Sequence, residues 1–165
     1  AGGNATVIYE AALNEYAPLG IEAAVTNTAT VSGTGITPVT AAETVNAEAA
    51  PNLAITKSVS PVPVTENGTL TYTFRIQNYG SVAATNTTGV VITDTFAPVL
   101  NNLTAALNGT AWTAATDYTY NETTGTFSST AGAITVPAAT YTQDSTTGAW
   151  VVTPGESTLV ITGTV

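Results

Sequence analysis

The chain has 165 residues, a formal net charge of −9 and only two basic side chains, so it lacks the positive surface that nucleic acid or an anionic membrane requires. It contains no Cys, His or Met, which excludes thiol and imidazole catalysis, haem ligation and zinc sites of the usual ligand types. Charged residues make up only 8% of the chain. We expect an extracellular or cell-surface β-protein with no cofactor, no metal site and no membrane insertion.

Strand signals recur along the chain as alternating β-branched and aromatic residues, separated by turn sequences such as ENG, LNG and ETTG. No stretch has the apolar stripe of an amphipathic helix. The pattern predicts an all-β fold, an immunoglobulin-like antiparallel β-sandwich. Strand signals are found at 24–31, 53–62, 69–78, 89–96, 118–129, 148–153 and 157–165.

The only lysine lies in an apolar row. In a strand, alternate side chains share a face, so Leu53, Ile55, Lys57 and Val59 point to the same side. The other basic residue, Arg75, is expected to point outward, opposite the apolar residues of its strand. Lys57 is therefore the one cation that the sequence predicts on the core side.

Two further polar residues interrupt apolar faces in the same way. Asp94 shares a face with Val90, Ile92 and Phe96. Asn27 shares a face with Val25, Ala29 and Val31. An amine, an acid and an amide are thus all predicted to point inward.

Residues 52–96 resemble the opening half of the "conserved repeat" domain of prokaryotic surface proteins, catalogued as domain of unknown function eleven. The shared pattern is a Lys-bearing strand ending in Pro, a turn with Gly, a Tyr-bearing strand ending in Asn and Gly, and a strand ending Thr-Asp-Thr. Residues 17–33, with Asn-Thr-Ala-Thr-Val, resemble the strand that closes that domain. The resemblance covers under half of the chain and implies immunoglobulin-like sandwiches strung in tandem on cell surfaces.

The order of these pieces differs from that of the family, because the closing strand here precedes the Lys strand. We therefore expect residues 1–33 to be a donor strand region that completes a neighbouring copy, 34–51 to be a linker, and 52–165 to be an incomplete sandwich body. The neighbouring copy is either a separate subunit or the next period of one tandem polypeptide. Self-completion is the alternative, since 34–51 is long enough, at about 3.3 Å per residue, to fold back on its own body.

The three inward polar residues predict a chemical step. An amine and an acid removed from water favour their neutral forms, and a neutral Lys57 can attack the side-chain carbonyl of Asn27 while Asp94 assists by moving the proton. Contact inside a packed core supplies an effective molarity on the order of 10⁵ M. The set resembles the collagen-adhesin isopeptide domains, in which a first-strand Lys joins a last-strand Asn beside an inward Asp.

A second interpretation of the same residues is a buried Lys57–Asp94 ion pair that Asn27 caps by hydrogen bonds, with no covalent bond. No Ser or Thr has a convincing base, so turnover catalysis is not expected. The sequence thus predicts a structural subunit of an extracellular filament or stalk, a homopolymer of identical copies. The alternative is an adhesin module of a tandem-repeat surface protein that binds a ligand through its loops.

Overall fold

The structure is a computed structural model that describes residues 3–20 and 23–165. Its regular elements are strands, apart from the short 3₁₀ helix η1 (Asn86–Thr88), and the pairings in the β1–β2 hairpin and in the two sheets of the body are antiparallel. The prediction of an all-β fold with antiparallel sheets is confirmed, whereas completion by a donor strand stays a prediction. The strands are β1 (Ala24–Gly33), β2 (Ile36–Asn46), β3 (Leu53–Ser60), β4 (Thr69–Asn78), β5 (Thr93–Thr95), β6 (Asn101–Leu107), β7 (Thr110–Ala111), β8 (Tyr118–Asn121), β9 (Thr126–Ser129), β10 (Thr140–Gln143), β11 (Trp150–Thr153) and β12 (Gly155–Thr164).

The chain divides into two compact units, each of which is described by itself. The first unit holds Ala1–Ala47 and Tyr141–Val151, and the second holds Glu48–Thr140 and Val152–Val165. Among the described residues no helix has the length and apolar character needed to cross a membrane.

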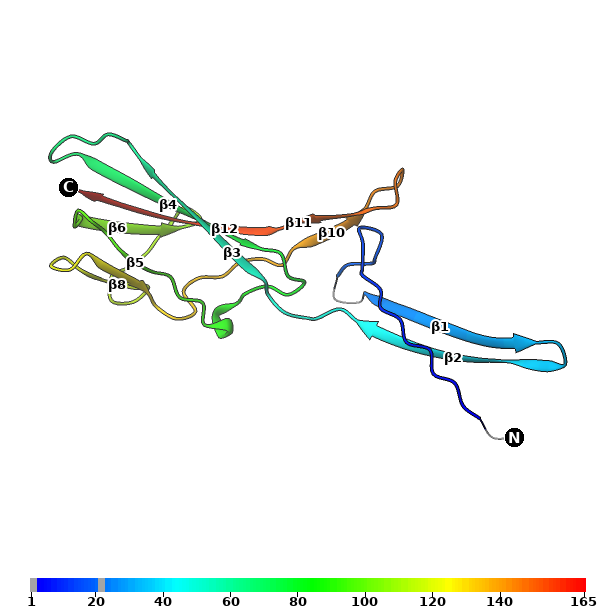
Figure 1. Cartoon of the computed structure of the whole chain (residues 1–165). Coiled ribbons are helices and arrows are strands. Elements are labelled where there is room, and N and C mark those ends of the chain that lie inside the picture. The colour runs from blue at the N-terminus through cyan, green and yellow to red at the C-terminus, as the bar shows by residue number, and fades with distance from the viewer. Residues whose placement is uncertain (1–2, 21–22) are drawn as a thin grey trace. The chain divides into compact units, whose positions relative to one another are not determined.

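The second unit is built like a β-sandwich. Its larger sheet has the strand order β3-β4-β12-β6-β7, and its smaller sheet has the order β5-β9-β8 (Figure 1). Buried side chains from both sheets form one hydrophobic cluster, so the two sheets share a core. The larger sheet thus has five strands and the smaller sheet has three.

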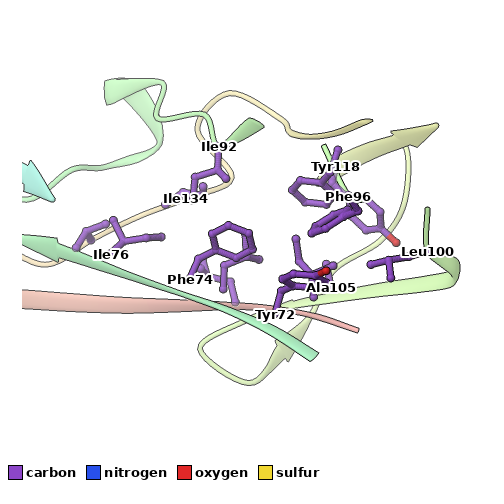
Figure 2. Close-up of a cluster of buried hydrophobic side chains, with 14 of the residues drawn as sticks. Tyr72, Phe74, Ile76, Ile92, Phe96, Leu100, Ala105, Tyr118 and Ile134 are labelled. Atoms are coloured by element: carbon purple, nitrogen blue, oxygen red, sulfur yellow. The ribbon is translucent and has the colours of Figure 1, made fainter. Parts of the chain in front are cut away.

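The core follows from the alternation along the two central strands of the larger sheet. In β4, Leu70, Tyr72, Phe74 and Ile76 are buried, and their neighbours along the strand are not. Figure 2 shows Tyr72, Phe74 and Ile76 within the buried cluster. The paired strand β12 alternates in the same way across Ser157, Leu159, Ile161 and Gly163. Because side chains repeat every two residues, this alternation fixes which face of the sheet is the inside.

Strand β3 lies at the edge of this sheet, and its inward row is uncovered. It pairs with β4 so that Ile55 is opposite Ile76, Lys57 opposite Phe74 and Val59 opposite Tyr72, which places all three on the core side. Ile55 nevertheless remains 53% exposed and Val59 39%, whereas Phe74 is 3% exposed. The hydrophobic core therefore stops at β4.

The first unit contains the hairpin β1–β2, whose register places Val25 opposite Val45, Ala29 opposite Ala41 and Val31 opposite Val39. In this register one face carries these apolar pairs, and the other carries the threonine-rich pairs. Nearly all of the hairpin's side chains are exposed. Residues 36–46, which the sequence analysis placed inside a linker, thus form a strand paired with β1.

Asn78, at the end of β4, is a fully buried side chain that holds several loops together. Its Oδ1 accepts hydrogen bonds from the backbone N–H groups of Asn52 and Gly80, both at 2.9 Å. Its Nδ2 donates to the carbonyl oxygens of Val82, at 2.8 Å, and Pro137, at 2.9 Å. One amide therefore binds four backbone groups of the surrounding loops, of which the N–H of Gly80 is buried and the other three are partly buried.

We expect Asn78→Ala to lower the free energy of unfolding by about 2–4 kcal/mol, because it leaves these backbone groups unsatisfied. Urea unfolding of the chain is the measurement, with the midpoint expected to fall at an unchanged slope. The control is Gln77→Ala on the outward face of the same strand, for which a loss of less than about 1 kcal/mol is expected. Equal effects of the two substitutions would contradict the role assigned to Asn78.

Candidate functional site

Lys57 and Asp94 meet at the uncovered edge of the sandwich. Lys57 projects from the middle of β3 and Asp94 from the middle of β5, so the two residues belong to different sheets. Lys57 Nζ donates a hydrogen bond to Asp94 Oδ2, and the two groups form an ion pair. The inward direction predicted for both side chains accounts for this contact across the sandwich.

Three aromatic rings surround the same ammonium group. Lys57 Nζ lies 4.8 Å from the ring centroid of Tyr72, 5.4 Å from that of Phe74 and 5.2 Å from that of Phe96. The negative faces of aromatic rings attract a cation at such distances. The rings are themselves parts of the core (Figure 2), and Tyr72 and Phe96 lie 4.7 Å apart between centroids. The amine is therefore held by a carboxylate and by an apolar wall.

The site is open to solvent on one side. The side chain of Lys57 is 40% exposed and that of Asp94 is 18% exposed. Asp94 also accepts a hydrogen bond through Oδ1 from the N–H of Thr95, at 2.9 Å, which fixes the carboxylate orientation. The sequence predicted a buried amine, but the described chain leaves it half-covered because nothing covers the inward row of β3.

Asn27, the third predicted site residue, lies on β1 in the first unit. Its side chain is exposed, and its Nδ2 donates a hydrogen bond to the hydroxyl of Tyr9. The predicted parity holds, since Asn27 shares a face with Val25, Ala29 and Val31. Residues 1–2 and 21–22 of the predicted donor region lie outside the described residues.

Glu43 is a candidate functional residue that the sequence reasoning did not identify. The register of the hairpin places it directly opposite Asn27, on the same apolar face. This acid and this amide form the polar row of a face that otherwise carries valine and alanine. The signal in the sequence is the alternation Val39, Ala41, Glu43, Val45, which becomes informative only when β2 is known to be a strand.

Three further ionisable groups have partners or surroundings of their own. Arg75 points outward, as predicted, and its guanidinium forms an ion pair with Glu156 on β12. Hydrogen bonds from the backbone N–H groups of Thr147 and Thr146 lower the pKa of Asp144, in the turn between β10 and β11. Burial raises the pKa of Tyr118.

A hollow of about 600 Å³ lies beside β8 and is lined by Leu103, Ala114, Ala115, Tyr118, Thr119, Tyr120, Asn121 and Glu122. Within residues 3–20 and 23–165 there is no cluster of acidic side chains suited to hold a metal ion.

Comparison of the chain with protein-family models, curated proteins and solved structures gives no match. The resemblance to the conserved repeat domain therefore depends on the sequence motifs alone.

We predict that Lys57 and Asp94 are energetically coupled by about 1 kcal/mol, because the pair is partly shielded from water and lies against aromatic rings. The measurement is a double-mutant cycle with Lys57→Met and Asp94→Asn by urea unfolding. Dilute chain carrying Asn27→Ala is used, so that no covalent bond to Asn27 contributes.

The matched control is the same cycle for Arg75 and Glu156, whose side chains are more exposed. In 1 M salt the coupling of this surface pair should fall to near zero, while that of Lys57 and Asp94 should largely persist. A Lys57–Asp94 coupling of zero at low salt would show that the contact contributes nothing to folding.

Proposed function

We propose that the chain is a structural subunit of an extracellular filament or surface stalk, in which the N-terminal hairpin region of one copy completes the sandwich body of the next. The observation that carries the proposal is the uncovered inward row of β3. The register with β4 places Leu53, Ile55 and Val59 on the core side of the sheet. All three side chains are nevertheless exposed, Leu53 by 37%. Covering their exposed parts would contribute on the order of 3 kcal/mol.

The chain also carries an exposed apolar surface of the complementary kind. Val31 and Val39 are each 66% exposed on the hairpin, and Val45 is 71% exposed. A face with such a contiguous set of apolar side chains is typical of an interaction site. Edge strands and open cores are completed in other assemblies by strands that a neighbour supplies. Donor and acceptor surfaces thus occur together in one sequence.

We further propose that Lys57 of the completed body forms an isopeptide bond with Asn27 of the donor. The new bond joins Lys57 Nζ to Asn27 Cγ, and the bond from Cγ to the amide nitrogen breaks. The lysine amine loses a proton, the leaving nitrogen gains it, and one ammonia departs for each bond formed. Asp94, already in contact with Nζ, is placed to carry that proton.

The connection between β2 and β3 favours donation between copies. Strands joined by a short connection such as residues 47–52 pair most readily with each other. A hairpin that folded back on its own body would therefore bring β2 against β3, and Asn27 on β1 would lie one strand farther away, about 4.8 Å. A hairpin from another copy is free of this restriction.

The adhesin alternative predicted from the sequence would use the loops or the hollow beside β8. It does not account for the uncovered row of β3 or for the three aromatic rings around Lys57. We therefore place the structural role first.

If the proposal is right, assembled wild-type chain boiled in detergent will run as a ladder of multimers. Mass spectrometry of the digested ladder will detect a branched peptide containing Lys57 and Asn27 that is lighter by one ammonia. Lys57→Met and Asn27→Ala should each collapse the ladder to a single monomer band, because each removes one of the two bonded atoms.

Asn46→Ala is the matched control, since Asn46 lies on the opposite face of the same hairpin, paired with Ala24. Its ladder should equal that of the wild type. A monomer band from intact wild-type filaments would exclude the bond between copies, and the branched peptide within a monomer would instead support self-completion.

A further inference from the structure

We infer that the donated element is the whole β1–β2 hairpin, and that it enters the smaller sheet of a second copy beside β5, with Glu43 and Asn27 facing that copy's Lys57. This inference rests on the proposed function and specifies its docking surface. A single donor strand, as the sequence analysis expected from residues 1–33, would leave β2 without a role.

The strand count of the body indicates where the hairpin fits. The larger sheet has five strands and the smaller has three, and β5 is a free edge of the smaller sheet. Two added strands would make the two sheets equal and would lie over the flank of the larger sheet that β3 occupies. Packed sheets lie about 10 Å apart, so the apolar face of the hairpin would contact the inward row of β3.

The Lys57–Asp94 contact supports this docking position. Lys57 already extends from β3 across the sandwich to Asp94 on β5. A strand added beside β5 lies about 4.8 Å farther along the same sheet. An inward Asn27 on that strand would therefore meet the end of the Lys57 side chain without any rearrangement of the body.

The charge pattern of the two surfaces also matches. The hairpin face is apolar except for the row of Asn27 and Glu43, and the row of β3 is apolar except for Lys57. A carboxylate covered by an apolar surface requires a cation or hydrogen-bond donors. The chain has only two cations, and Arg75 is engaged with Glu156 on the outward face. Lys57, already paired with Asp94, is therefore the basic side chain on the inward side from which Glu43 would accept a hydrogen bond on docking, whether the amine is charged or neutral.

Two adjacent alanines of β2 provide a direct test. Ala41 lies on the apolar face, opposite Ala29, and Ala42 lies on the other face, opposite Thr28. Both side chains are exposed in the described chain, so Ala41→Asp and Ala42→Asp should leave the fold of the unassembled chain unchanged, as circular dichroism can verify. Filament growth is followed by light scattering and electron microscopy.

We expect Ala41→Asp to slow filament growth by roughly tenfold or more, because docking would bury an unpaired charge. Ala42→Asp should stay within about twofold of the wild type. Ala29→Asp, on β1, should block growth whether the donor is one strand or two.

The outcomes separate this inference from the function on which it rests. Normal growth of Ala41→Asp beside a blocked Ala29→Asp would overturn the inference and leave donation by β1 alone. Equal inhibition by Ala41→Asp and Ala42→Asp would contradict docking through one face. Wild-type chain that forms no filaments at any concentration would overturn the proposed function itself.

Discussion

The ladder between β3 and β4 is the constraint on which the rest of the site depends. The pairing of Lys57 with Phe74 fixes the lysine on the core side of the sheet, because Phe74 belongs to the alternating buried row of β4. A shift of the register by one residue would turn Lys57, Ile55 and Val59 outward, and the contact with Asp94 would be lost. The position of the amine is thus set by backbone hydrogen bonds and by the packing of β4, and not by the ion pair.

The surroundings of Lys57 connect its chemistry to assembly. In the described chain the ammonium group is partly hydrated, paired with Asp94 and placed against three rings. An ammonium group has no lone pair with which to attack a carbonyl, so a site in this state does not react. Covering the row of β3 would remove water and favour the neutral amine and acid. Bond formation would then follow docking, and the cross-link would form only in copies that are correctly joined.

The sequence predicted the elements with strong alternation and missed those without it. The signals at 69–78 and 157–165 correspond closely to β4 and β12, because β4 alternates large apolar residues with polar ones and β12 contains the β-branched and apolar run Leu159–Thr162. Strand β6 has the sequence NNLTAAL, in which the small alanines give only a weak alternation. Residues 34–51 also contain few large apolar side chains, so strand β2 was not predicted. The inward direction of Lys57 and Asp94 was predictable from parity. Their contact was not, because the pairing of β3 with one sheet and β5 with the other depends on topology.

The register of the β1–β2 hairpin could not be predicted from the sequence. The opposition of Asn27 and Glu43 follows from the turn at residues 34–35, where Gly35 adopts a φ of 76° that favours glycine, and from the register shift between Val31 and Gly33. Without that shift Asn27 would lie opposite Ala42. Since the hairpin and the open flank of the body are different surfaces of one chain, the contact proposed between copies would be heterologous. A heterologous contact that does not close into a ring continues indefinitely, because each added copy presents a new uncovered β3. If the proposed assembly is right, a linear filament would require no second protein to define its repeat, and residues 47–52, which join the hairpin to the body, would set the spacing of copies.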